Sequence, residues 1–88
     1  MLVLLVGYTM SKMTFEDTLI RLRDHKSSFR GTHTQTEIAA TILLMCFGVS
    51  PQVGTEEWDT ALQYIERMVA WGILEVEGAW YRVDWEAF

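Results

Sequence analysis

The chain has 88 residues, 50% of them hydrophobic, with 12 Asp and Glu against 7 Lys and Arg. This length allows one domain with a single core. Because Cys46 is the only cysteine, the sequence excludes an intramolecular disulfide and a thiolate metal cluster, and it favours a cytoplasmic protein over a secreted one. The net charge of −5 disfavours binding to nucleic-acid phosphate unless the few cations gather on one face.

Residues 1–13 open with an apolar run, Met-Leu-Val-Leu-Leu-Val. This run is too short to cross a bilayer, which takes about 20 residues, and no basic segment precedes it as in a secretory signal. We predict a short strand or an extension here, followed by a single domain at residues 14–88, and we expect no membrane partner. The same run is compatible with an intermolecular strand, and hence with a homodimer.

The first helix is predicted to begin after Thr14, whose hydroxyl can cap it. Phe15, Leu19 and Leu22 then follow one another at helical spacing and form an apolar stripe. Residues 27–34, which include a glycine, are predicted to be a loop.

The second helix has a stronger start signal, because Thr34 and Glu37 match a capping box. Gly48 is placed to end it in a left-handed conformation. We expect this helix to be the most buried of the three, through a wide apolar stripe: Ile38, Ile42, Leu43, Leu44, Met45 and Cys46.

A third helix is predicted from about Thr55 to Trp71, with Gly72 ending it. Its expected apolar face consists of Trp58, Ala61, Leu62, Ile65, Met68 and Val69.

Apolar and acidic residues alternate after the third helix, where Leu74 and Val76 are interleaved with Glu75 and Glu77. Such alternation is typical of a strand, and Gly78 favours a tight turn into a second strand. The predicted fold class is therefore mainly α with a small β-hairpin (α+β).

This order of elements resembles the winged helix-turn-helix superfamily over about residues 14–84, and it implies a three-helix core with a C-terminal wing. The link at residues 48–54 is longer than the three or four residues usual in a helix-turn-helix. The resemblance is carried by Gly48-Val49-Ser50-Pro51, Ala61-Leu62-x-x-Ile65-Glu66, Trp71-Gly72-Ile73-Leu74 and Gly78-x-x-Tyr81-Arg82-Val83.

The resemblance implies that the helix from Thr55 is the one offered to the DNA major groove. Charge is distributed unfavourably for that role. Residues 12–33 hold five basic and three acidic residues, a net +2, whereas residues 34–88 hold two basic and nine acidic residues, a net −7. Carboxylates beside phosphates are costly without neighbouring cations.

No catalytic apparatus is visible, so we predict that the chain is not an enzyme and binds no cofactor or metal. His25 and His33 lack companion ligands at a compact spacing, and we interpret them as histidines of a solvated loop or helix end. Cys46 is interpreted as a small apolar residue of a buried helix.

Two groups of residues are candidate protein-interaction sites. The first is the polar face of the third helix, Glu56, Asp59, Gln63 and Glu66, whose alternative interpretation is ordinary solvated surface. The second is the set of C-terminal aromatics Trp80, Trp85 and Phe88, which are binding anchors if exposed and core residues if they close the domain beneath the hairpin.

Arg21, Arg23, Lys26 and Arg30 form the candidate nucleic-acid surface, with a solvated helix end as the alternative. The primary hypothesis is a small acidic regulatory module of winged-helix type, an adaptor or inhibitor that contacts a basic protein partner, of the kind a phage or mobile element encodes. The alternative hypothesis is a dimeric DNA-binding transcriptional regulator of the same fold.

Overall fold

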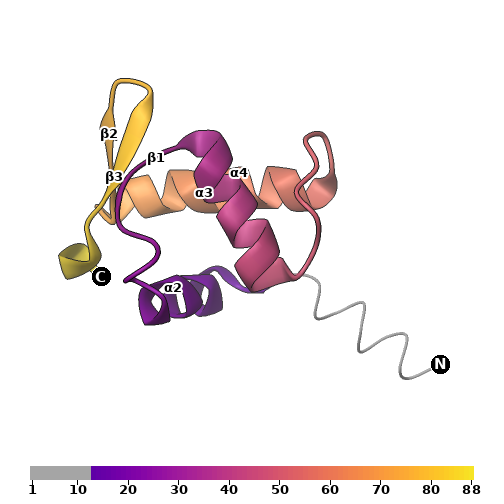
Figure 1. Cartoon of the computed structure of the whole chain (residues 1–88), viewed down its shortest axis with the longest axis horizontal. Coiled ribbons are helices and arrows are strands. Elements are labelled where there is room, and N and C mark those ends of the chain that lie inside the picture. Colours follow the sequence, from indigo (N-terminus) through magenta and orange to yellow (C-terminus); the bar gives the residue numbers. More distant parts are fainter. Residues whose placement is uncertain (1–12) are drawn as a thin grey trace.

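The computed structural model describes residues 13–88, which form three helical segments and a small antiparallel sheet (Figure 1). The strand or extension predicted for residues 1–13 lies outside the described residues, apart from Met13. In chain order the elements are α2 (Phe15–Asp24), β1 (Gly31–Thr34), α3 (Gln35–Thr41), the π-helical turn η1 (Ile42–Phe47), α4 (Glu56–Ala70), β2 (Leu74–Glu77), β3 (Trp80–Val83) and the 3₁₀ turn η2 (Trp85–Ala87).

Helix α2 begins where the sequence predicts. The Thr14 hydroxyl accepts a hydrogen bond from the Asp17 amide at 3.2 Å, which satisfies one of the free donors at the helix start. Phe15, Leu19 and Leu22 are buried, as expected. Thr18 is buried with them, because it lies on the same face three to four residues from its apolar neighbours.

The predicted capping box is present at the start of α3. The Thr34 amide donates to the Glu37 carboxylate at 2.8 Å, and the Glu37 amide donates to the Thr34 hydroxyl at 3.2 Å. The second helix continues from α3 into η1, where the Gly48 amide donates to the carbonyl of Leu43, five residues earlier. Gly48 then ends it with φ 68°, the predicted left-handed conformation.

The prediction that Leu44 belongs to the buried stripe is wrong. Leu43 is completely buried, whereas the side chain of Leu44 is 59% exposed. Leu44 follows Ile42 by two residues, which is about half a helical turn, and it therefore faces away from the core.

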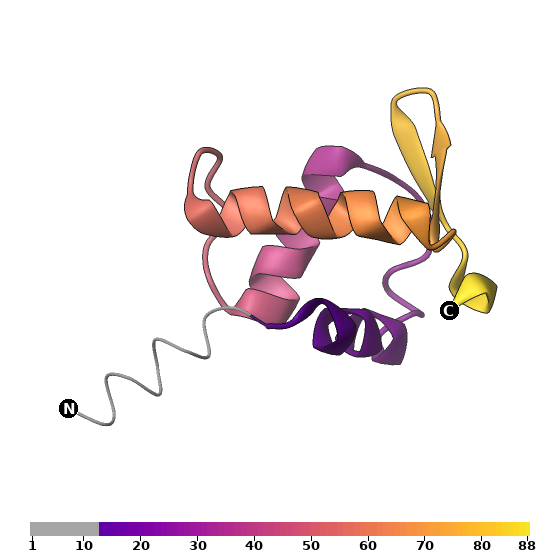
Figure 2. The same cartoon turned by 180° about the vertical axis from the view of Figure 1, so that it is seen from behind.

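Helix α4 is the longest element, and Thr55 caps it by accepting from the Trp58 amide at 3.2 Å. Trp58, Ala61, Ile65 and Met68 are buried, and Leu62 and Val69 are partly buried against the same core. The predicted apolar face is therefore confirmed. Figure 2 shows α4 in front of α3, crossing it at the centre of the domain.

The predicted loop at residues 27–34 is wrong in its last part, because Gly31–Thr34 forms strand β1. The sheet order is β1-β3-β2, with both neighbours antiparallel to β3. The Gly-Thr-His-Thr sequence of β1 has no alternating apolar pattern. It becomes a strand because β3 offers it an open edge, a long-range pairing that local sequence does not encode.

The β2–β3 hairpin is present as predicted, with a two-residue turn at Gly78-Ala79. Gly78 has φ 65°, a conformation that suits glycine in such turns. Leu74 is buried, but Val76 is 56% exposed although it lies on the same face of β2, because the hairpin projects beyond the helices toward its tip (Figure 1).

Leu43 and Leu44 allow a matched test of this core. Leu43→Ala should destabilise the protein by about 2–5 kcal/mol, because it leaves a cavity among buried side chains. Leu44→Ala should change the stability of the monomer by no more than about 0.5 kcal/mol, since the side chain is mostly in water. Urea unfolding of dilute protein measures both values, and equal losses for the two variants would contradict the placement of η1.

Candidate interaction surfaces

The outward face of α4 is acidic. The residues at successive helical turns, Glu56, Asp59, Gln63 and Glu66, are all exposed, because α4 directs its apolar residues into the core on the opposite side. We call these four residues the acidic stripe. The structure thus brings together the four residues that the sequence singled out, on one face of one rigid helix.

The one basic residue of α4, Arg67, reaches toward α2. Its guanidinium carbon lies 3.9 Å from the centre of the Phe15 ring, and a guanidinium nitrogen lies 3.9 Å from the Glu16 carboxylate. An aromatic face attracts a cation through its quadrupole, so Phe15 and Glu16 together hold Arg67 over α2. Arg67 is therefore engaged with residues of α2.

The hairpin neutralises its own cation. Arg82 donates a hydrogen bond to Glu75 and lies 3.3 Å from the Glu77 carboxylate. The hydrogen bond and the negative charge of Glu75, with a further contribution from Glu77, raise the pKa of the Arg82 guanidinium above its ordinary value. Sequence reasoning missed this triad, although the two-residue turn fixes the register that places Arg82 opposite Glu75.

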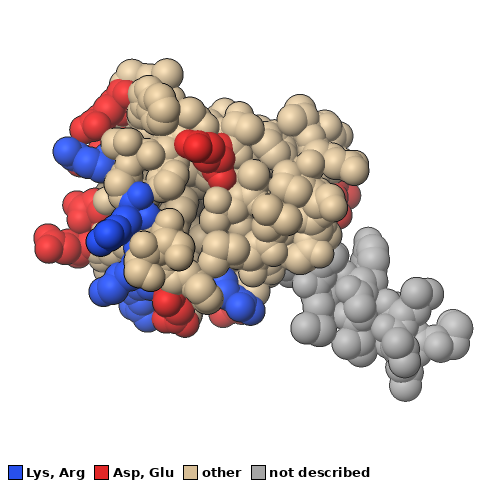
Figure 3. All heavy atoms as spheres, in the orientation of Figure 1, with Lys and Arg blue, Asp and Glu red and all other residues tan. Residues whose placement is uncertain are grey.

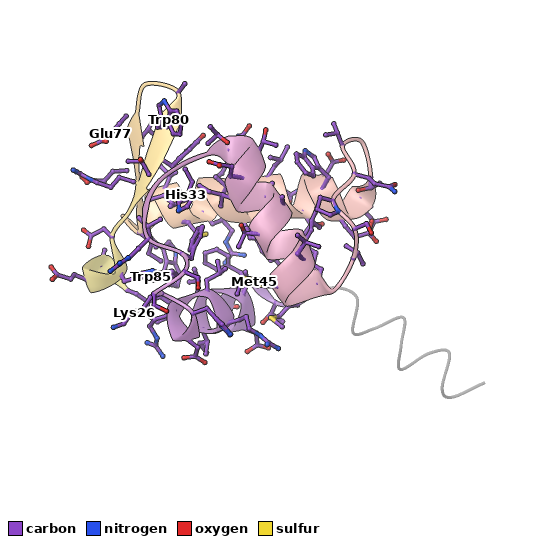
Figure 4. The ribbon with its side chains drawn as sticks, in the orientation of Figure 1. Lys26, His33, Met45, Glu77, Trp80 and Trp85 are labelled. Atoms are coloured by element: carbon purple, nitrogen blue, oxygen red, sulfur yellow. The ribbon has the colours of Figure 1, made fainter. Side chains whose placement is uncertain are left out.

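Trp80 lies on the same outer face of the sheet as Arg82 and is 49% exposed. It pairs with Glu77 in the register of the hairpin, and Figure 4 shows both residues at the tip. The alternative interpretation, in which the C-terminal aromatics close the core, does not hold for Trp80. An exposed tryptophan beside carboxylates combines a large apolar contact area with negative charge.

Trp85 and Phe88 behave differently from Trp80. The indole Nε1 of Trp85 donates to the Phe29 carbonyl at 2.9 Å, and its partly buried ring packs against the core. Phe88 is exposed, but the Arg23 guanidinium carbon lies 4.6 Å from the centre of its ring. Of the three predicted anchors, Trp80 is therefore the one whose ring is most available to a partner.

The four predicted phosphate-contacting residues, Arg21, Arg23, Lys26 and Arg30, are exposed, but they do not lie along α4. Arg21 and Arg23 belong to α2, and the other two lie between α2 and β1. Figure 3 shows Lys and Arg gathered over this end of the molecule with acidic side chains among them, and Figure 4 places Lys26 near the C-terminal end of α2. Arg23 is in addition engaged with Phe88.

Both histidines make hydrogen bonds to nearby backbone. A ring nitrogen of His25 lies 2.9 Å from the Arg21 carbonyl, and one of His33 lies 2.8 Å from the Arg30 carbonyl. His33 belongs to β1 and stacks on Phe29, so the interpretation of this residue as part of a solvated loop is wrong. Within residues 13–88, no three His, Cys, Asp or Glu side chains are arranged to hold a metal ion.

Comparisons with known proteins do not identify the chain: no family model, curated protein or solved structure matches it. Within residues 13–88, none of the helices has both the length and the apolar character needed to cross a membrane.

Cys46 is buried in η1, and this burial raises the pKa of its thiol from 9.0 to about 11. The thiolate fraction at neutral pH is then about 100-fold lower than for an exposed cysteine. We expect a thiol reagent to label the native protein at least that much more slowly than the unfolded protein. Native-state labelling at the rate of a free thiol would contradict the placement of Cys46.

The raised pKa of the Cys46 thiol makes the stability of the protein depend on pH in the alkaline range. Because the folded-state pKa is raised, the folded protein favours the neutral thiol. The stability contributed by this preference is complete below pH 9.0 and is lost as the pH rises toward 11. Cys46→Ala should remove this contribution to the dependence of the free energy of unfolding on pH. Urea unfolding at a series of pH values measures that dependence.

Proposed function

We propose that this chain is a small non-enzymatic regulatory module of winged-helix type that acts by binding a basic surface of a protein partner. The observation that carries the proposal is the acidic stripe on α4, three carboxylates on one helix face with the cation of that helix held elsewhere. The arrangement of elements supports the fold assignment, because β1 between the first two helices joins the C-terminal hairpin in one sheet.

The electrostatics of this surface favours a protein over DNA as its partner. In a winged-helix protein that binds DNA, the third helix and the wing approach phosphates, which attract cations. Here the corresponding helix presents carboxylates, and the hairpin cation Arg82 is already paired with Glu75 and Glu77. A partner rich in Lys and Arg is electrostatically complementary to this surface, whereas a phosphate backbone is repelled by it.

Trp80 adds an apolar contact to this charge pattern. Interfaces gain most of their binding free energy from a few anchors, among which tryptophan is over-represented. A half-exposed Trp80 next to Glu77 suits a partner that combines an apolar pocket with a basic rim. An adaptor or inhibitor of a basic protein, including one that itself handles nucleic acid, fits these requirements.

The alternative function, a dimeric DNA-binding regulator, is supported by the exposure of Arg21, Lys26 and Arg30 at one end of the molecule. These cations suit contacts to backbone phosphate. These residues belong to other elements than α4. This placement disfavours a complex in which they contact the DNA backbone while α4 occupies the major groove.

Charge neutralisation on the stripe tests the proposal directly. A fluorescent oligo-arginine peptide serves as the basic probe, and its affinity should fall about 10-fold in the triple variant Glu56→Gln, Asp59→Asn, Glu66→Gln at low salt. The matched control is Asp17→Asn, Asp24→Asn, Glu86→Gln, which changes the net charge by the same amount at exposed residues outside α4. Equal losses in the two variants would show that net charge alone, and not the stripe, attracts the basic probe.

Fluorescence anisotropy with a random DNA duplex tests the alternative. We expect no binding at about 50 mM salt, where electrostatic DNA binding is strongest. Micromolar binding that weakens steeply at about 200 mM salt would favour the DNA-binding regulator instead. In that case, alanine substitutions at Arg21, Lys26 and Arg30 should abolish the binding.

A further inference from the structure

The outer face of the sheet is one continuous surface with a tryptophan at its centre. Alternate residues of β3, Tyr81 and Val83, pack against the core, so the residues between them face solvent. Side chains directly opposite one another in antiparallel strands are neighbours, with Cβ atoms about 4.5–5.5 Å apart. The strand register therefore defines the outer sheet face, which consists of Thr32, Thr34, Glu75, Glu77, Trp80 and Arg82.

The ring of Trp80 is open to a ligand. Trp80 belongs to the central strand, between Thr34 and Glu77, and its side chain is 49% exposed (Figure 4). Arg82, two residues along the same face, is directed to the carboxylates of the hairpin. Within residues 13–88, the ring–ring and cation–π contacts of the domain are made by other aromatic side chains and leave the Trp80 ring uncovered.

The charges around this ring select a cation. Arg82 supplies one positive charge against the two negative charges of Glu75 and Glu77, so the outer sheet face carries a net −1. The Glu37 carboxylate, which accepts from the backbone of β1 at 2.8 Å, adds negative charge at the far edge of the sheet. An indole face also attracts cations, through its quadrupole. The ring of Trp80 and the carboxylates beside it therefore favour a ligand of the same sign.

The domain already holds an arginine of its own in such an environment. The guanidinium carbon of Arg67 lies 3.9 Å from the centre of the Phe15 ring, and a guanidinium nitrogen lies 3.9 Å from the Glu16 carboxylate. Trp80 and Glu77 offer the same combination of an aromatic face and a carboxylate, with the position of the arginine left open. The planar guanidinium stacks on aromatic rings and is more weakly hydrated than the ammonium of lysine.

We infer that the outer sheet face binds an arginine side chain of the partner, with the guanidinium stacked on Trp80 and paired with Glu77. This inference deepens the proposed function and rests on it, because a basic partner supplies the arginine. It assigns to the sheet a preference for arginine over lysine, which net charge alone does not provide.

Fluorescence anisotropy with labelled hexa-arginine and hexa-lysine peptides tests the inference at about 50 mM salt. We expect the full chain to bind hexa-arginine more tightly, on the order of 5-fold, as a single exposed cation–π contact provides. Trp80→Leu should remove this preference by weakening hexa-arginine binding alone. Trp71→Leu is the matched control, since Trp71 is exposed to the same extent (50%) at the end of α4, and it should keep the preference. Circular dichroism checks that both variants fold.

Equal affinities of the wild-type chain for the two peptides would overturn the inference. A preference that persists in Trp80→Leu would assign it to carboxylates elsewhere, and an equal loss for both peptides would reduce Trp80 to an apolar contact. Either result contradicts arginine stacking on this ring, as does loss of the preference in Trp71→Leu.

The stripe variant separates this inference from the proposed function. Glu56→Gln, Asp59→Asn, Glu66→Gln leaves the outer sheet face unchanged, so it should weaken both peptides and keep their ratio. If the stripe variant behaves as its charge-matched control while Trp80→Leu removes the preference, the role of the acidic stripe fails and the arginine site stands. The reverse pair of results retains the stripe and rejects the arginine site.

Discussion

Helix α4 forms the centre of the domain, and the way it is packed determines the rest of the surface. Trp58, Ala61, Ile65 and Met68 are buried against the other elements, so one side of the helix is fully committed to the core. A helix that buries one side must direct its polar residues to the other. The acidic stripe is therefore a consequence of packing: three of its four exposed side chains are carboxylates, and their direction is fixed by the apolar contacts on the other side of the helix.

Three of the positive side chains contact other groups of the domain. Arg67 lies over the Phe15 ring, Arg82 pairs with two carboxylates of its own hairpin, and Arg23 covers Phe88. Each of these contacts is worth little to stability, because exposed pairs are screened by water. Their importance is to the charge pattern, since they bring three guanidinium groups close to rings or carboxylates of the same domain.

Much of the architecture was accessible from local sequence signals. The three helix starts at Thr14, Thr34 and Thr55 were predictable because a capping hydroxyl acts on amides only two or three residues away. The hairpin was predictable because its turn and alternation are equally local. Strand β1 was not predictable, since its pairing with β3 joins segments about fifty residues apart and its own sequence has no strand pattern. Helical geometry could have predicted that Leu44 is exposed. The continuous apolar run around it, residues 42–47, hid the boundary between the buried and exposed sides of the helix.

The candidate surfaces also differ in whether local sequence or long-range packing determines them. The sequence by itself determined that Glu56, Asp59 and Glu66 share one helix face, because helical periodicity alone sets that relation. Only the tertiary structure decided which charges remain available: it placed Arg67 over α2, turned Trp80 outward and Trp85 inward, and separated the α2 cations from α4. These outcomes depend on how elements distant in the chain pack against one another, and packing between elements is the information that a periodic pattern does not contain.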